Sequence, residues 1–158
     1  MTVPSARRSC SARAAARAAV WALTRAGADV SIWNRTSARA EGLGARVVTE
    51  PISADVLVNC TSVGLDRSSS PFKDLPLDAD GLSEFATVAD LVYKVSGTML
   101  IAEAQQRGIE TVDGLEILVC QGALSFTIWT GQAPPRDQMR AAARHGRTQA
   151  PCSPNPFH

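Results

Sequence analysis

The feature that most constrains the fold is the alternation of short β-rich segments with helical ones along most of the chain. Runs such as 29–33, 54–60 and 87–93 are rich in β-forming residues, and helical stretches punctuated by Gly or Pro lie between them. Strands that alternate with helices build a mostly parallel sheet covered by helices. The 158 residues are enough for one domain. The sequence therefore predicts an α/β fold with a doubly wound, mostly parallel sheet.

The elements can be assigned from local signals. Gly27 and Gly108 are typical of positions just past a helix end, and Thr36 is typical of a helix N-cap. The apolar run 54–60 predicts a buried strand of a parallel sheet. Predicted helices cover 12–26, 36–40, 98–107, 114–129 and 134–144, and predicted strands cover 29–33, 46–49, 54–60, 87–93 and 109–112.

Composition excludes several classes of protein. The 16 basic and 15 acidic side chains give a net charge of +1, so we expect no nucleic-acid partner and no membrane attachment. No apolar run approaches the ~20 residues that span a bilayer. The two histidines and the widely spaced cysteines favour no metal site, and we expect Cys60 and Cys120 to be inert thiols. A cytoplasmic protein is the expectation.

Ligands of parallel sheets bind beyond the carboxyl ends of the strands, so the residues that follow each predicted strand are the candidates. After the strand 29–33 an NAD site would place an Asp or Glu, but this chain has Arg35 and Arg39 around Thr36. Two guanidinium groups four residues apart at a helix start suit a 2′-phosphate, which indicates NADP rather than NAD. The alternative is that both arginines are solvated surface residues.

The glycine-rich turn that normally binds the diphosphate of a dinucleotide is missing. The stretch 11–17, about 20 residues upstream of the arginines, has no glycine, and 3–9 does not have the pattern of a strand. The fold is therefore expected to lack its first strand and its glycine-rich loop. A bare edge within a parallel sheet is costly and prone to aggregation.

Four blocks carry a resemblance to a known family: NRTSAR at 34–39, DVLVNCTSVG at 55–64, DLVY at 90–93 and DGLEILVCQGALSFTIWTG at 113–131. In this order and spacing they resemble the NADP-binding half of the shikimate dehydrogenases, including the quinate/shikimate enzymes. The resemblance runs from about residue 14 to residue 144. It implies a Rossmann-like domain and NADP as the cofactor.

The resemblance also implies roles for individual residues. Positions that match the family's adenosine 2′-phosphate motif are Asn34, Arg35, Thr36 and Arg39. Positions that match its cofactor loop and its nicotinamide end are Asn59, Thr61, Leu91 and Gly114. Tyr93 and Gln121 match side chains that reach shikimate or 3-dehydroshikimate. Asp90 and Asp113 fit strand-end or capping roles, so we assign neither of them as a general base.

Family members carry their catalytic Lys–Asp pair on a domain N-terminal to the cofactor domain, and no residue here matches that pair. Hydride transfer needs the substrate to be held against the nicotinamide beside a proton acceptor, so we expect no catalytic residue in this chain and no turnover by it alone. Arg13 and Ala14 stand where the family has glycines, and their Cβ atoms should crowd the phosphates.

We therefore expect an aberrant segment at 1–13, an NADP-binding domain with C-terminal helices at 14–145, and a disordered Pro-rich tail at 146–158. A one-base frameshift in a GC-rich codon run is one hypothesis for residues 10–15. An Arg-rich, Ser-rich transit peptide is the alternative for the first 28 residues.

The leading functional hypothesis is an NADP-dependent oxidoreductase that interconverts 3-dehydroshikimate and shikimate. The alternatives are a catabolic quinate/shikimate dehydrogenase and a non-catalytic nucleotide-binding remnant. The sequence leaves open whether the protein forms a homodimer.

Overall fold

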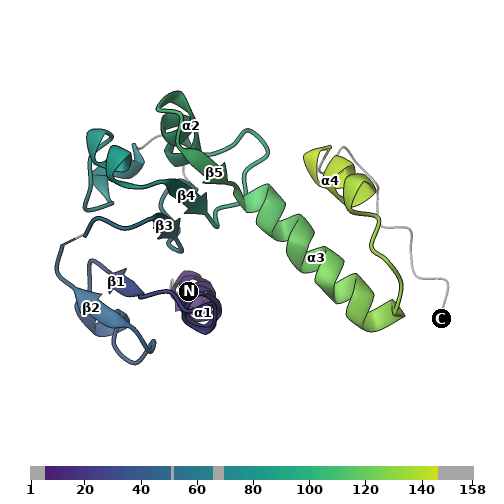
Figure 1. Ribbon diagram of the computed structural model, residues 1–158, viewed down its shortest axis with the longest axis horizontal. Helices are drawn as coiled ribbons and strands as arrows, with labels where there is room; N and C mark the ends of the chain where they lie inside the picture. The colour runs from purple at the N-terminus through teal and green to yellow at the C-terminus, as the bar shows by residue number, and fades with distance from the viewer. Residues whose placement is uncertain (1–5, 51, 66–69, 146–158) are drawn as a thin grey trace, which may run out of the picture. The chain divides into compact units, whose positions relative to one another are not determined.

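The structure is a computed structural model that describes residues 6–50, 52–65 and 70–145, with side chains described from Arg13 onward. The chain divides into two compact units, Met1–Gly114 and Leu115–His158 (Figure 1). The predicted tail at 146–158 lies outside the described residues. Of the predicted segment 1–13, the structure describes the backbone from Ala6 and the side chain of Arg13.

The first unit contains the strands and two of the helices. Its elements are α1 (Ala6–Arg25), β1 (Ser31–Trp33), β2 (Arg46–Val48), β3 (Val56–Asn59), β4 (Thr87–Asp90), α2 (Met99–Gln106) and β5 (Glu110–Val112). Three short 3-10 helices, η1 (Ser37–Arg39), η2 (Pro71–Lys73) and η3 (Asp80–Glu84), lie between the strands. The second unit is built from α3 (Gly114–Thr130), which begins at the boundary, and α4 (Arg136–Arg144).

All strand pairs in the described residues are parallel, so the predicted α/β class is confirmed. The strands form two sheets, one of order β1-β2 and one of order β3-β4-β5. Ser31 is in register with Arg46 in the first sheet, and Asn59 is in register with Asp90 in the second. The division into two sheets agrees with the predicted loss of a strand, because the doubly wound order would place one strand between β1 and β3.

The strand predicted at 54–60 is β3, which lies at the edge of its sheet, so the prediction of a buried strand is wrong for its first residue, Val56. The carbonyl oxygens of Asp55 and Asn59 accept hydrogen bonds from the β4 side. Because peptide groups alternate between the two sides of a strand, those of Val56 and Val58 face the other edge. Val56 is 43% exposed.

The core of the first unit lies against the three-stranded sheet. Buried apolar side chains from η3, β4 and α2 form one cluster, composed of Leu82, Phe85, Val88, Leu100, Ile101 and Ala104. Leu57 of β3 and Ile109 before β5 pack against it. This packing fixes the strands whose carboxyl ends form the candidate site.

The ends of the helices follow the predicted signals, with two corrections. Gly27 has a positive φ of 87°, and the amides of Gly27 and Ala28 bond to carbonyls of the last turn of α1. Thr36 precedes η1, but its side chain makes no capping hydrogen bond, so the predicted Thr36 cap is wrong. The second correction concerns Arg35, which lies before the helix because η1 begins only at Ser37. Arg35 and Arg39 are therefore not four residues apart on one helix, as the sequence predicts.

In the described part of the chain, no helix combines the length and the apolar character that crossing a bilayer requires.

Candidate functional site

The carboxyl ends of β3 and β4 bring predicted site residues together. Asn59 ends β3, Asp90 ends β4, and the strand register sets them side by side. β5 runs parallel to β4 and ends at Val112, just before Gly114 (Figure 1). This edge is the place where parallel α/β sheets bind their ligands.

Asn59 organises the loop that follows β3. Its side chain is 5% exposed, and its Oδ1 accepts hydrogen bonds from the Thr61 amide at 3.0 Å and the Thr61 hydroxyl at 2.7 Å. Its Nδ2 donates to the Val63 carbonyl oxygen at 3.2 Å. The Thr61 hydroxyl in turn accepts a hydrogen bond from the Val63 amide at 3.1 Å. The polar side chains of Asn59 and Thr61 are therefore engaged in hydrogen bonds within the loop and, for Asn59, also with Asp90.

Asp90 is the buried acid of this edge. Its side chain is 0% exposed, and it accepts hydrogen bonds from Asn59 Nδ2 at 2.9 Å and from Thr98 Oγ1 at 2.6 Å. Burial raises the pKa of Asp90, whereas the hydrogen bonds from Thr98, Val92 and Asn59 act in the opposite direction. Burial and the nearby Asp90 charge raise the pKa of Cys60 to about 11, so its thiol stays protonated at neutral pH.

The segment that leaves β4 carries two of the predicted residues. The Leu91 amide bonds to the Asn59 carbonyl oxygen at 3.0 Å, which extends the pairing one residue beyond the strand. Tyr93 follows with a side chain that is 38% exposed. The Lys94 ammonium donates to the Gly64 carbonyl oxygen at 3.0 Å. The exit of β4 and the loop after β3 are thus tied together at two points.

Gly114 permits a close approach of backbone to backbone at this edge. A Cβ at position 114 would meet the Val92 carbonyl oxygen and would lie 2.6 Å from the Val92 carbonyl carbon and 2.8 Å from the Tyr93 nitrogen. These backbone atoms cannot move aside as the end of a side chain can. Glycine is required here for space, because α3 begins directly against the exit of β4.

We predict that Gly114→Ala lowers the free energy of unfolding by about 1–3 kcal/mol, because the added methyl group overpacks the backbone. Gly122→Ala is the matched control on the same helix, since a Cβ there meets only the terminal carbon of Met139. Alanine should stabilise the helix at that position by up to about 1 kcal/mol. Urea unfolding of both variants measures the difference, and equal stability of the two would contradict the packing argument.

The predicted 2′-phosphate residues follow the carboxyl end of β1. Arg35 is exposed and forms an ion pair with Asp74 at 3.6 Å, an interaction of little energetic weight at the surface. Arg39 is exposed on η1, and no other described residue forms an ion pair or hydrogen bond with its guanidinium group. Asn34 is partly buried and Thr36 is exposed. Both guanidinium groups are therefore available to an anion.

The stretch that would hold the glycine-rich turn is helical. α1 runs without interruption from Ala6 to Arg25, so it includes the predicted position of the turn at 11–17. A turn with free amides directed at a diphosphate cannot exist inside a hydrogen-bonded helix. This helix agrees with the prediction that the glycine-rich loop is missing. The helix begins at Ala6, earlier than the predicted start at residue 12.

The second unit carries the remaining predicted residue. Gln121 is exposed on α3. Within this unit Arg140 of α4 binds Glu116 of α3 through contacts of 2.9 and 3.0 Å, and these lower the pKa of Glu116. The pair attaches α4 to the first part of α3.

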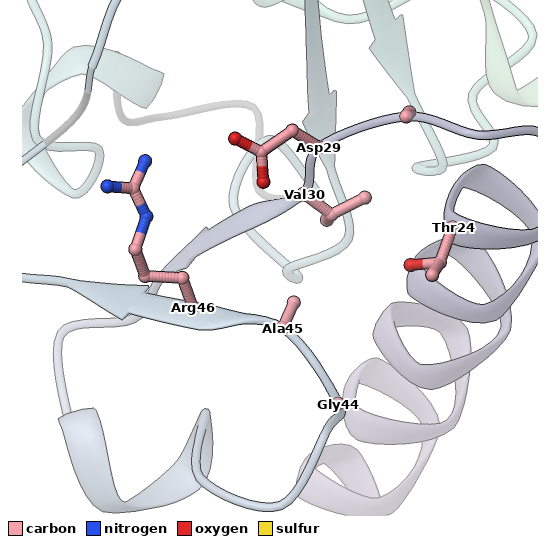
Figure 2. A pocket seen from close by; sticks show the side chains of 7 residues that line it. Thr24, Asp29, Val30, Gly44, Ala45 and Arg46 are labelled. Carbon is pink, nitrogen blue, oxygen red and sulfur yellow. The ribbon is translucent and has the colours of Figure 1, made fainter.

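An open pocket of about 440 Å³ lies at a different edge. Figure 2 shows it where β1 and β2 begin, beside the end of α1. Its lining residues are Thr24, Ala28, Asp29, Val30, Gly44, Ala45 and Arg46. Because this is the amino end of the strands, it is opposite to the edge at which such sheets bind ligands.

The sequence predicts only a strand-end or capping role for Asp90 and does not indicate Lys94 or Asp74. The spacing of an acid at the end of one predicted strand and an amide at the end of the neighbouring strand could have indicated the Asn59–Asp90 pair. No local signal could have indicated the contact of Asp74 with Arg35, because the partners are joined only by the tertiary fold.

Known proteins are similar to this chain in sequence. The family described as Shikimate 5′-dehydrogenase C-terminal domain matches residues 114–144. Shikimate dehydrogenase (NADP(+)) from one strain of Thermus thermophilus is 43% identical over 136 residues, which are 82% of this chain and 50% of that protein. The chain thus spans about half the length of the curated relatives it matches.

Solved structures share the fold. Shikimate 5-dehydrogenase from another strain of Thermus thermophilus, in complex with NADP(H) and shikimate, aligns with a TM-score of 0.65 and 38% identity over 81% of this chain and 50% of that one. The ligand-free 5-ketofructose reductase of a Gluconobacter species aligns with a TM-score of 0.70 and 29% identity over 83% and 52%. The fold is Rossmann-like. Over most of its length the chain is therefore similar to about half of the shikimate dehydrogenases, and its residues 114–144 match the model of their C-terminal domain.

Proposed function

We propose that this chain is the cofactor-binding part of an NADP-dependent shikimate dehydrogenase, which reduces 3-dehydroshikimate to shikimate. The observation that carries the proposal is the segment after β1, where two exposed guanidinium groups stand in a stretch, 34–40, that contains no acid. A carboxylate there would bind the ribose hydroxyls of NAD and repel the 2′-phosphate of NADP. The relatives named for NADP(+) support the same cofactor.

In this proposal the residues divide by the part of the ligand they meet. Asn34, Arg35, Thr36 and Arg39 bind the adenosine 2′-phosphate. The loop of Asn59 and Thr61, together with Leu91 and Gly114, receives the nicotinamide end, and Tyr93 and Gln121 contact the substrate. The bound cofactor supplies the hydride. The groups of this chain hold the cofactor and substrate in place, and proton transfer belongs to a Lys–Asp pair on a substrate domain outside residues 14–145.

The fit of NADP to the described residues is good at one end and poor in the middle. The two arginines suit the 2′-phosphate, and β3 and β4 end at the edge where parallel sheets bind their ligands. The uninterrupted helix α1 offers no turn for the diphosphate. We therefore propose that the chain binds NADP weakly and does not turn over shikimate alone.

The test is a calorimetric titration of the full chain with NADP, NAD and adenosine 2′,5′-bisphosphate. We expect NADP and the bisphosphate to bind at least about tenfold more tightly than NAD, because one charge-assisted contact to the extra phosphate is worth about 1.5–3 kcal/mol. Absence of binding to all three would favour the non-catalytic remnant. Tighter binding of NAD would contradict the NADP proposal, and NADPH production from shikimate by the purified chain would contradict the proposed division of labour.

A further inference from the structure

The buried carboxylate of Asp90 has no part in the proposed chemistry, yet it accepts three hydrogen bonds within the candidate site. It is completely buried. Its Oδ1 accepts hydrogen bonds from Asn59 Nδ2 at 2.9 Å and from the Val92 amide at 3.0 Å. Its Oδ2 accepts one from Thr98 Oγ1 at 2.6 Å. The groups that contact it are thus all donors, as an ionised carboxylate requires.

These bonds reach three separate segments of the chain. Through Asn59, which lies 31 residues away, Asp90 holds the end of β3 and the loop after it. Through the Val92 amide it fixes the exit of β4, against which Gly114 packs. Through Thr98, whose hydroxyl also accepts the Ile101 amide at 3.3 Å, it fixes the start of α2. The same side chain therefore sets the relative position of all three.

The loop after β3 depends on the orientation of the Asn59 amide. Asn59 has two donor hydrogens and one acceptor oxygen with two lone pairs, and the contacts described above use all four positions. The bond to Asp90 determines which way the amide points. If the amide rotated, Oδ1 would face the Asp90 carboxylate and Nδ2 would face the donors of Thr61.

Lys94 makes a second connection on the same side. Its ammonium donates to the Gly64 carbonyl oxygen at 3.0 Å, and its charge acts to lower the pKa of Asp90. The segment 59–64 is thus held at its start by the Asp90–Asn59 pair and at its end by Lys94. Both connections run to residues at or just beyond the end of β4.

We propose that Asp90 is a positioning residue of the cofactor site: it holds the 59–64 loop and the exit of β4 in one fixed arrangement, so that their backbone is preorganised for the nicotinamide end of NADP. The inference rests on the proposed function for the identity of the ligand. Asp90 is not a general base, because a fully buried carboxylate surrounded by donors cannot reach the substrate.

The test replaces Asp90 by the isosteric amide and measures two ligands. Asp90→Asn keeps the volume but loses an acceptor, so that one of the three donors loses its partner. We expect NADP affinity to fall on the order of tenfold, whereas adenosine 2′,5′-bisphosphate, which has no nicotinamide, binds within about twofold of the unaltered chain. Asp80→Asn, at an exposed acid that pairs only with Arg107 in the salt bridges of the described residues, is the control for loss of charge.

Amide hydrogen exchange provides the readout that does not depend on ligand. In Asp90→Asn the amides of Thr61 and Val63 should exchange at least about tenfold faster, beyond any change common to β5 and α2. In the unaltered chain the amides of Thr61, Val63 and Val92 should open together as denaturant is added. This exchange measurement on the unaltered chain tests the role of Asp90 even if Asp90→Asn does not fold.

Three results would overturn the inference: equal loss of affinity for both ligands, exchange that changes alike throughout the first unit, or opening of Thr61 and Val63 separately from Val92. Failure of the proposed function has a different signature. In that case the unaltered chain binds neither nucleotide, while the exchange results still report whether Asp90 holds the loop.

Discussion

Replacing residues 1–14 by an apolar strand of about six residues and a glycine-rich turn should join the two sheets and tighten NADP binding at least about tenfold. The physical reason lies in the two open edges. In β3 the peptide groups of Val56 and Val58 point away from β4. Before β1 the Val30 carbonyl accepts a hydrogen bond from the Arg46 amide and so points toward β2. The peptide groups of Ser31 and Trp33 therefore point away from β2. One parallel strand supplies partners to both edges and gives the doubly wound order.

The new strand should also stabilise the fold. Covering the exposed apolar side of β3, including Val56, should raise the free energy of unfolding by about 2–3 kcal/mol. Chemical unfolding measures this change, and calorimetry measures the affinity for NADP. The matched control carries the same strand but keeps Arg13 and Ala14 in place of the glycines. It should gain stability without gaining affinity, because Cβ atoms block the approach of the diphosphate. An unchanged midpoint of unfolding in both chains would show that the two edges do not accept a common strand.

The second large effect is expected from the arginines. Arg35→Ala combined with Arg39→Ala should reduce NADP affinity about a hundredfold and leave NAD affinity within about twofold, because two charge-assisted contacts to the 2′-phosphate are lost. Arg35→Ala alone should lower NADP affinity less than Arg39→Ala alone, because the Arg35 guanidinium group also pairs with Asp74 at 3.6 Å. Titration of NADP and NAD against each variant measures the change in preference.

The control for the arginine pair removes equal charge elsewhere. Arg17 on α1 and Arg144 on α4 are exposed, and replacing both by alanine should leave the preference for NADP unchanged. If this control lowers NADP affinity as much as the double change at 35 and 39, net charge rather than a local site attracts the phosphate. If neither variant changes the preference, the 2′-phosphate binds outside the segment 34–39.

The candidate site illustrates what could be predicted from the sequence. The motif residues lie where parallel-strand logic places them: Asn59 at the end of β3, Leu91 and Tyr93 just after β4, and Gly114 at the start of α3. The chemistry of the Asn59 and Thr61 side chains could not be predicted in the same way. Both form hydrogen bonds within the loop or to Asp90, and only the distances show that these bonds consume their polar groups.

The sequence by itself determined the local structure of this protein. Glycines such as Gly27, at a φ that other residues rarely adopt, and a capping Thr98 end or start helices through contacts within a few residues, so short-range pattern is enough to predict them. Only the tertiary structure decided which strands are left at the open edges and that Asp90 is the centre of a buried network. Those outcomes depend on partners such as Asn59 and Asp90, 31 residues apart, whose interaction requires the folded arrangement of strands.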